Sequence, residues 1–301
     1  MMGRDDRPSI SVGMPVYNGE PYVESALRSV LDQTFDDFEL IVCDNASTDR
    51  TSEIVRDLAS SDRRIRYSCN ERNLGAAGNY NHAFALARAP YFRWMNADDL
   101  IEPELHALCL QALKSNPEAV LAYGHTRIID ADGAVTADYN DNLHLDDPRP
   151  SVRFRQFFER VGLANVIFGL MRRDALARTS LMGNGRMPAA DIRMMAELTL
   201  LGRFIALEPT LFYRRMHAEA SSWDRTDSTR QATFWGNTSS DFVIPHWRLY
   251  AGYLYRALQY RLAPLERARV ISHVFHLMYW GRGKLATDLV GLVRPRQGTS
   301  S

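Results

Sequence analysis

Residues 10–123 alternate between short apolar runs and helix-like segments, and this alternation is the strongest constraint on the fold. The apolar runs have the length of buried strands and cover Ile10–Met14, Phe38–Cys43, Ile65–Cys69, Tyr91–Met95 and Val120–Tyr123. The intervals read as helices over Pro21–Leu31, after an N-cap at Asp49, over Gly75–Arg88 and over Pro103–Lys114. Strands that alternate with helices at this spacing predict an α/β fold with a mostly parallel open sheet flanked by helices.

Polar side chains follow two of these strands where each strand ends. Asp44 and Asn45 follow the second strand, and Asp98 and Asp99 follow the fourth. Because ligands of such sheets bind at the carboxyl ends of the strands, we expect the four side chains to share one rim. Purely structural roles as Asx turns or helix caps are the alternative.

The pattern changes after Gly124. We expect a hairpin over Ile128–Val135, a polar loop over Asp138–Pro150 and a mobile loop over Trp223–Ser240. Further expected elements are a helix over Ser151–Arg160, a strand over Asn165–Met171, a helix over Asp191–Leu201 and short strands over Phe204–Ala206 and Thr210–Tyr213. Residues from Phe242 to Val293 read as helices interrupted at Pro264 and at Gly281–Gly283.

Composition excludes several classes of protein. The 301 residues carry 36 basic and 36 acidic side chains, so no overall positive charge favours a nucleic-acid partner. Three widely spaced cysteines, Cys43, Cys69 and Cys109, predict buried free thiols in a reducing compartment. The first residues lack the apolar core of a signal peptide, and no apolar run is long enough to span a membrane, so a cytoplasmic location is expected.

Four motifs in order carry a resemblance to a known family. They are SVGMPVYNGEPYVESALRSVLDQTF, FELIVCDNASTDRT, RNLGAAGN and YFRWMNADDLIEP, whereas no G-x-G-x-x-G follows the first strand and no Walker-type loop is present. From about Ser9 to Ser222 the chain resembles the family 2 glycosyltransferases of the GT-A fold. The resemblance implies an inverting enzyme that uses a nucleoside-diphosphate sugar and a divalent metal, Mg²⁺ or Mn²⁺.

The resemblance also implies roles for residues on the expected rim. Asp98 would bind the metal directly, Asn96 stands where the family's D-x-D motif has its first acid, and Asp99 would lie behind the metal or on the acceptor side. The expected nucleotide-binding residues are Pro15, Tyr17, Asp44, Asn45, Asn73 and Asn96. Many relatives have two consecutive acids where this chain has Asp44-Asn45, so the nucleobase is left open.

Three further positions belong to the acceptor half. Asp191, at the start of its helix, would be the general base that deprotonates the acceptor hydroxyl, although a helix cap is the alternative. Arg214 and Arg215 can donate to phosphate. His217 is either an additional metal ligand or a latch for the following loop.

The resemblance divides the chain into a nucleotide-sugar half at 1–125, an acceptor half at 126–222, the loop at 223–240 and a helical extension at 241–301. Acceptors of three kinds remain open: a sugar or glycan, a lipid-linked acceptor, or a small molecule such as a secondary metabolite. A non-catalytic nucleotide-sugar-binding protein is the alternative from another class. A nucleotidyltransferase would need a glycine-rich basic loop after the first strand, where this chain has GMPVYNGEPY.

The C-terminal segment has its own charge. From Val243 onward nine basic residues face two acidic ones, and Leu258–Val293 mixes these basic residues with apolar ones. Such a helix can lie on the anionic inner face of a membrane, which would make the protein peripheral. Packing of the apolar face on the catalytic domain, or on a second subunit in a homodimer, is the alternative.

Overall fold

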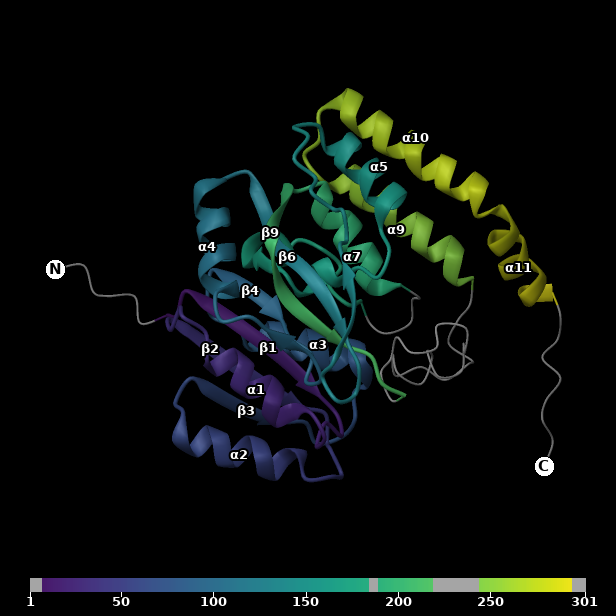
Figure 1. Cartoon of the computed structure of the whole chain (residues 1–301). Coiled ribbons are helices and arrows are strands. Elements are labelled where there is room, and N and C mark those ends of the chain that lie inside the picture. The colour runs from purple at the N-terminus through teal and green to yellow at the C-terminus, as the bar shows by residue number, and fades with distance from the viewer. Residues whose placement is uncertain (1–6, 184–188, 219–243, 294–301) are drawn as a thin grey trace, which may run out of the picture.

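The computed structural model describes residues 7–183, 189–218 and 244–293 of the chain. Among these residues the chain forms one nine-stranded sheet in the order β3-β2-β1-β4-β8-β6-β9-β5, with β7 paired to β6. Helices cover the sheet, and three C-terminal helices lie together at one side of the molecule (Figure 1). The loop expected at Trp223–Ser240 lies outside the described residues.

The first half of the chain builds the parallel part of the sheet. Strands β1 (Ile10–Val16), β2 (Phe38–Asp44), β3 (Ile65–Cys69) and β4 (Tyr91–Trp94) all pair in parallel. They are connected through helices α1 (Val23–Leu31), α2 (Thr51–Ser61) and α3 (Gly75–Leu86). Every residue of β1 and β2 is buried, which explains why these strands read as continuous apolar runs instead of alternating ones.

The second half adds antiparallel strands to the same sheet. Helix α4 (Leu105–Ser115) leads into the long strand β6 (Ala119–Ile129), which pairs in parallel with the still longer β9 (Arg203–Arg215). Strands β5 (Leu100–Ile101), β7 (Val135–Tyr139) and β8 (Leu170–Arg172) pair antiparallel with their neighbours. The remaining elements are α5 (Pro150–Arg160), the 3₁₀ turn η1 (Asn165–Phe168), α6 (Arg173–Leu176) and α7 (Ala190–Thr199).

Several expected elements differ from the observed ones. The expected strand Asn165–Met171 is instead the 3₁₀ turn η1 followed by the short strand β8, because Ala164 takes a left-handed conformation before the turn. The two short strands expected between 204 and 213 form the single strand β9, which keeps pairing with β6 across register shifts. Strand β6 also extends to Ile129, past the boundary expected at residue 125.

The thiol prediction was correct for two cysteines and wrong for one. All three cysteines are free, and Cys43 and Cys109 are buried in the core. Cys69 is exposed because it ends β3, the outermost strand on its side of the sheet.

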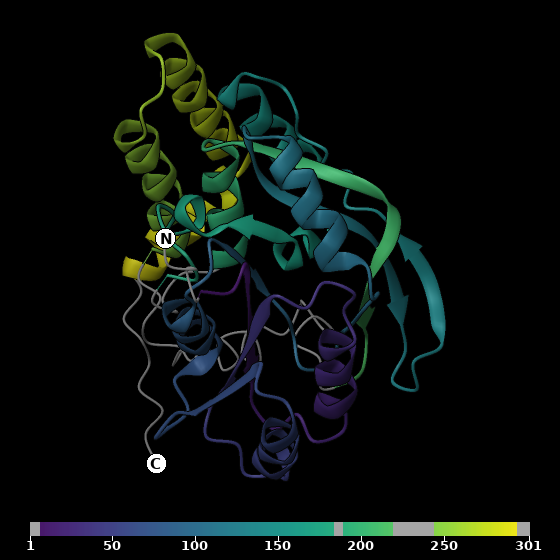
Figure 2. The same ribbon diagram turned by 90° about the vertical axis from the view of Figure 1, so that its left-hand side faces the viewer.

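The C-terminal segment forms helices α9 (Pro245–Gln259), α10 (Pro264–Trp280) and α11 (Arg282–Val293), with breaks at the predicted positions. Helix α10 packs on α5 and α9 through the fully buried Val270 and Val274. Figure 2 shows these helices beside the acceptor half, away from α2. No helix in the described ranges has the length and apolar character needed to cross a membrane.

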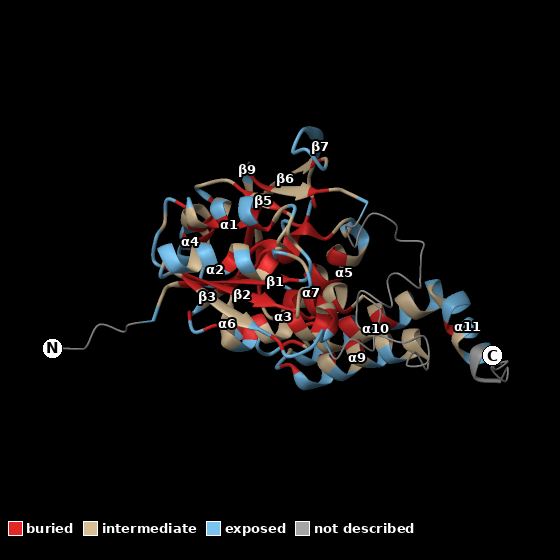
Figure 3. Cartoon of the chain, turned by 90° about the horizontal axis from the view of Figure 1, so that it is seen from below, coloured by how far each residue is buried: buried red, intermediate tan, exposed pale blue. Residues whose placement is uncertain are grey.

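Burial is concentrated in the sheet and in the helix faces that cover it (Figure 3).

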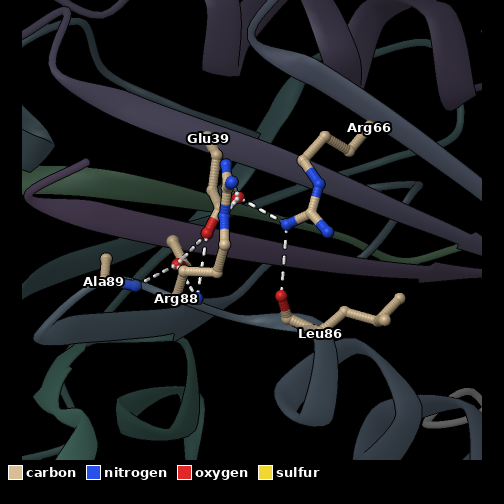
Figure 4. A network of polar contacts seen from close by, with 6 residues as sticks. Glu39, Arg66, Leu86, Arg88 and Ala89 are labelled. Carbon is tan, nitrogen blue, oxygen red and sulfur yellow. Dashed lines mark hydrogen bonds and ion pairs between the residues drawn. The ribbon is translucent and has the colours of Figure 1, made fainter. Parts of the chain in front are cut away.

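One buried carboxylate helps to join β1, β2 and β3. Glu39 on β2 accepts hydrogen bonds from the hydroxyl of Ser11 at 2.7 Å and from the guanidinium groups of Arg66 and Arg88 (Figure 4). Burial opposes its ionisation, but these hydrogen bonds outweigh burial and hold the pKa of Glu39 below its usual value.

Candidate active site

The carboxyl ends of β1, β2 and β4 form one rim, as the sequence predicted. Asp44, the last residue of β2, is fully buried. Its Oδ1 accepts a hydrogen bond from the amide of Ser47 at 2.8 Å, and its Oδ2 accepts one from the hydroxyl of Tyr67 at 2.7 Å. Burial and these bonds raise the pKa of Tyr67, so its hydroxyl remains a donor to Asp44. In this arrangement Asp44 orders the loop that carries Asn45 and Ser47.

Asn45 connects this loop to the segment before α3. Its Oδ1 accepts hydrogen bonds from the amide of Leu74 at 2.8 Å and from the side chain of Asn70 at 3.0 Å. Its Nδ2 donates to Oδ1 of Asn73 at 2.8 Å, and the same oxygen accepts from the amide of Gly75. Asn45 and Asn73 therefore form one wall of the rim together.

Pro15 and Tyr17 lie at the end of β1 and differ in exposure. Pro15 is buried within the strand, whereas the ring of Tyr17 is 49% exposed just beyond it. The next residue, Asn18, has a left-handed backbone, and its side chain accepts a hydrogen bond from the amide of Thr48. This contact joins the loop after β1 to the loop after β2 and leaves Tyr17 facing solvent at the rim.

The half-buried Asn96 and the buried Asp99 form a hydrogen-bonded pair after β4. Asn96 accepts a hydrogen bond from the hydroxyl of Tyr80 and donates to Oδ2 of Asp99 at 2.9 Å. Oδ1 of Asp99 accepts from the amide of Arg215 at 2.8 Å. Burial raises the pKa of Asp99 above its usual range, and the charge of Asp98 raises it further. Asp99 thus anchors the end of β9 to the rim.

Asp98 points to a different partner. Its Oδ2 is 3.1 Å from Nε2 of His217, and the two side chains are 28% and 13% exposed. The ring of His217 lies 4.8 Å from that of Tyr22, at the start of α1. The sequence predicted that Asp98 and His217, 119 positions apart, belong to one site, and the fold places them in contact.

Arg214 and Arg215 point in different directions. Arg215 is buried, stacks over the ring of Tyr22 at 4.7 Å, and donates from Nε to the backbone oxygen of Asp98 at 2.8 Å. Its Nη1 donates to two backbone oxygens of the β6–β7 turn. Arg214 is only half-buried, and its Nη1 donates to the carbonyl of Leu163 at 3.2 Å and to Asn165. Arg215 therefore holds the rim together, and Arg214 lies on its acceptor side.

Asp191 begins helix α7 and is half-buried. Burial raises the pKa of the Tyr80 hydroxyl on α3, the charges of Asp98, Asp99 and Asp191 raise it further, and the charge of Arg214 lowers it. The charge of Asp191 thus acts on the same phenol as the two acids that follow β4.

Buried Glu197 fixes the orientation of α7. Its Oε1 is 2.8 Å from Nε of Arg193, its Oε2 is 3.5 Å from Arg256 on α9, and Oε2 also accepts from the amide of Ser180. A Cβ added at Gly252 on α9 would lie 2.7 Å from the guanidinium carbon of Arg193. The C-terminal extension is therefore packed directly against the helix that carries Asp191.

The donor set at the rim suits a metal that is shared with a ligand. Among residues 7–183, 189–218 and 244–293 no cluster of three or more acidic, histidine or cysteine side chains converges. Asp98 and His217 offer two donor groups, since both oxygens of Asp99 already accept hydrogen bonds. Mg²⁺ is commonly held by one or two protein groups together with substrate phosphates and water. The residues present therefore fit a divalent cation.

Three contributing residues were missed at the level of sequence. Tyr67, Tyr80 and Glu197 are buried or half-buried polar groups on β3, α3 and α7. Their partners, Asp44, Asn96, Arg193 and Arg256, come mostly from distant parts of the chain. Only the i,i+4 spacing of Arg193 and Glu197 was a usable signal, and that spacing is common on exposed helices.

Comparison with known proteins places this arrangement in a family. The model of "Glycosyl transferase family 2" matches residues 11–179. A chondroitin synthase of Escherichia coli is 26% identical over 232 residues, covering 75% of this chain and 32% of that protein. A protein of Methanocaldococcus jannaschii described as an uncharacterized glycosyltransferase is 32% identical over 141 residues, covering 46% of this chain and 49% of that protein. The chain thus spans between a third and a half of these relatives.

Solved structures share the fold. S. aureus TarS 1-349 in complex with UDP superposes with a TM-score of 0.63 at 17% identity, over 90% of this chain and 72% of that one. The mannosyltransferase PcManGT from Pyrobaculum calidifontis, in complex with GDP-Man and Mn²⁺, gives a TM-score of 0.56 at 16% identity, over 98% and 77% of the two chains. The α/β fold of GT-A type with a helical extension is thereby confirmed, and the chain belongs to glycosyl transferase family 2.

Proposed function

We propose that this protein transfers a sugar from a nucleoside-diphosphate sugar to an acceptor hydroxyl, with inversion and with a divalent cation. The observation that carries the proposal is the contact between Asp98, which follows β4, and His217, which follows β9, at the carboxyl ends of the parallel strands. Asp191, in the first turn of α7, is proposed as the base from the resemblance to the family. The relatives include a chondroitin synthase, and the solved neighbours were crystallised with UDP or GDP-Man. These names support a nucleotide-sugar donor and a glycan acceptor.

Each residue has a distinct role in the proposed reaction. Asp98 and His217 would hold a divalent cation, which offsets the charge that develops on the leaving diphosphate. Arg214 adds a cationic group on the acceptor side of the rim. The exposed ring of Tyr17 would stack on the nucleobase, and Asn96 would bond to the ribose. The polar atoms of Asp44 and Asn45 already form hydrogen bonds within the protein. Contacts of these two residues with the nucleobase therefore stay a prediction.

Asp191 supplies the proton acceptor. Asp191 lies in the first turn of α7, and its carboxylate would take the proton from the acceptor hydroxyl. The hydroxyl oxygen then attacks the anomeric carbon from the face opposite the diphosphate, which inverts the configuration. Asn at this position keeps the shape of the side chain but cannot take the proton.

The Asp191→Asn variant tests the proposal. Turnover should fall by about 10²–10⁴-fold, while the affinity for the donor stays within a factor of about two. The assay is release of UDP or GDP from a panel of sugar nucleotides with Mn²⁺, followed by NMR of the product's anomeric proton. Asp174→Asn, a change in α6 on the opposite edge of the sheet, is the control and should leave turnover intact.

Two results would reject the mechanism. Near-normal turnover by Asp191→Asn would remove this residue as the base, and retention of anomeric configuration would exclude a single displacement. Tight nucleotide-sugar binding without any turnover would favour the non-catalytic binding protein.

We also propose peripheral contact with a membrane through the outer face of α10 and α11. Phe275 and Tyr279 are 56% and 62% exposed there, and the exposed cations Arg282 and Lys284 follow them. Aromatic rings favour the interface, and each nearby cation adds about 1 kcal/mol on anionic lipid. The wild type should co-sediment with phosphatidylglycerol vesicles at low salt, and the double change Phe275→Ser with Tyr279→Ser should abolish this.

A further inference from the structure

A groove of about 770 Å³ runs between α5 and α10, on a part of the surface that the proposed reaction does not use. Helix α5 packs against α7 as well as against α10, so the groove lies near the acceptor half but outside the rim. Figure 1 shows α5 and α10 side by side at the outer edge of the molecule. Arg269 and Trp280 both line it, and eleven helical steps between them correspond to about 16 Å. The groove is therefore elongated along the helix axis.

Aromatic rings form part of the lining. Phe158 of α5 is half-buried, whereas Trp280 at the end of α10 is 70% exposed. The indole of Trp280 is held in place, because its Nε1 donates to Nε2 of His276 at 2.7 Å. A neutral His276 then carries its proton on Nδ1, where it can donate. Such exposure of a fixed indole beside hydrogen-bonding groups is unusual for a large apolar side chain.

Each arginine of the lining is paired with a carboxylate, one within the lining and two just outside it. Arg155 pairs with Glu159 at 2.8 Å, and both line the groove. Arg149 pairs with Asp147 at 2.9 Å, and Arg269 pairs with Glu266 at 2.7 Å. Each arginine has five N–H donors, so a single carboxylate does not use them all. The groove thus combines many directional donors and acceptors with little net charge.

The paired charges and the aromatic rings of the lining indicate which class of ligand fits the groove. A phosphate, a nucleic acid or an anionic membrane needs uncompensated positive charge, which the paired arginines do not supply. A purely apolar ligand would leave the ion pairs without hydrogen-bonding partners. A pyranose ring matches both features, since its C–H face stacks on the electron-rich face of an aromatic ring and its hydroxyl groups bond to charged side chains.

We propose that the groove between α5 and α10 binds a segment of the acceptor glycan, with a sugar ring stacked on Trp280 and hydroxyl groups bonded to Arg155 and Glu159. This inference rests on the proposed transfer to a glycan and adds a second site of contact beyond the rim. A growing chain held there stays near the protein between transfers, which raises its effective concentration at the rim.

The test measures binding without turnover. The full-length Asp191→Asn protein is applied to an array of neutral and acidic oligosaccharides, and the best binder is then titrated by calorimetry. Trp280→Ala should weaken that binding at least tenfold, and Arg155→Ala should weaken it several-fold. Trp280→Phe should restore much of the affinity, because the stacking surface is kept. An excess of UDP with Mn²⁺ should not displace the oligosaccharide.

Tyr279→Ala is the matched control, since Tyr279 is similarly exposed on α10, at 62% against 70% for Trp280, but does not line the groove. It should leave oligosaccharide affinity unchanged. Four outcomes would overturn the inference: no oligosaccharide of the array binds, Trp280→Ala binds the array like the parent protein, Tyr279→Ala loses as much affinity as Trp280→Ala, or UDP competes with the oligosaccharide. Thermal melting confirms that each variant is folded. Failure here leaves the turnover test of Asp191 unaffected, so the two proposals are judged separately.

Discussion

Asp98 and Asp99 are neighbours in the chain but have different environments. Both residues lie in the turn between β4 and β5, where Asp99 faces inward to the amide of Arg215 and Asp98 faces His217. The inward carboxyl is buried and its pKa is raised, whereas Asp98 keeps 28% of its side chain exposed. Only Asp98 is therefore placed to share a cation with a ligand.

This difference gives a prediction for nucleotide binding. Asp98→Ala should weaken the Mn²⁺-dependent binding of UDP or GDP by about a hundredfold or more, because it removes the carboxylate that would hold the cation. His217→Ala should have a smaller effect in the same direction. Calorimetry of the diphosphate with Mn²⁺ and with EDTA measures both.

Asp132→Ala, an exposed carboxylate in the β6–β7 turn, is the control and should behave like the wild type. The metal assignment fails if the diphosphate binds equally well in EDTA, or if Asp98→Ala binds normally.

His106 makes folding sensitive to acid. It is fully buried against the ring of Phe38, and burial lowers its pKa well below the usual value, helped by the charges of Arg93 and Arg64. The folded state keeps this ring neutral, while the unfolded chain takes up a proton below about pH 6.5. The contribution of His106 to stability is therefore complete above pH 6.5 and is lost as the pH falls.

The loss approaches about 1.4 kcal/mol per pH unit, which is the cost of one proton bound only by the unfolded chain. His106→Leu should flatten the decrease in unfolding free energy between pH 6.5 and pH 5. Urea titrations across this range measure it, with His144→Leu as a control at a half-exposed histidine. Parallel profiles for the wild type and His106→Leu would contradict the prediction.

At the scale of elements, the sequence predicted a helix or strand correctly where the segment itself contains the pattern that defines it. Strands β1 and β2 are mainly apolar runs, and the breaks before α10 and α11 are marked by Pro264 and Gly281, so these elements were predicted. The length of β9 was not, because Glu208 and Pro209 resemble a turn and only the partner β6 keeps the strand extended. The turn η1 was read as a strand because Val166, Ile167 and Phe168 form an apolar run.

The candidate site, too, was predictable from the sequence only in part. The rim was predictable because strand ends and motif order fix the positions of Asp44, Asn45, Asp98 and Asp99. The partners of these residues were not, because the bonds from Tyr67, Tyr80 and Arg215 depend on how separate elements pack.

Helix α7 depends on the C-terminal extension for its orientation. Glu197→Gln should lower the unfolding free energy by about 3–5 kcal/mol, since it leaves two arginines beside a buried site without their carboxylate. Glu24→Gln is a matched control in an exposed i,i+4 pair of 2.7 Å and should cost less than about 0.5 kcal/mol. Chemical unfolding measures both values.

The Gly252→Ala variant tests the orientation of α7 separately from the stability of the folded protein. The added methyl group displaces the guanidinium of Arg193, while alanine favours the helical state of α9 by up to about 1 kcal/mol. We expect lower kcat with unchanged donor KM and little loss of stability. A normal kcat in this variant would show that the packing of α9 on α7 does not position Asp191.

At the scale of the whole molecule, helices α10 and α11 serve as part of the core. Deleting residues 264–301 would uncover the aromatic cluster of Phe154, Phe158 and Tyr253, whose rings lie within 6 Å of one another in pairs. The truncated protein should be largely insoluble or bind a hydrophobic dye strongly. Soluble, active truncated protein would show that these helices are an independent attachment.

The contact between Asp99 and the amide of Arg215 joins positions 116 residues apart, and His217 follows two positions after Arg215. During synthesis the parallel half of the sheet emerges from the ribosome long before β9 does. A nascent chain that stops short of β9 therefore has Asp98 but not its histidine, and Asp99 without its backbone donor. Prematurely terminated products would carry the loops after β1, β2 and β4 without a finished rim, so under the proposed function sugar transfer would be confined to completed chains.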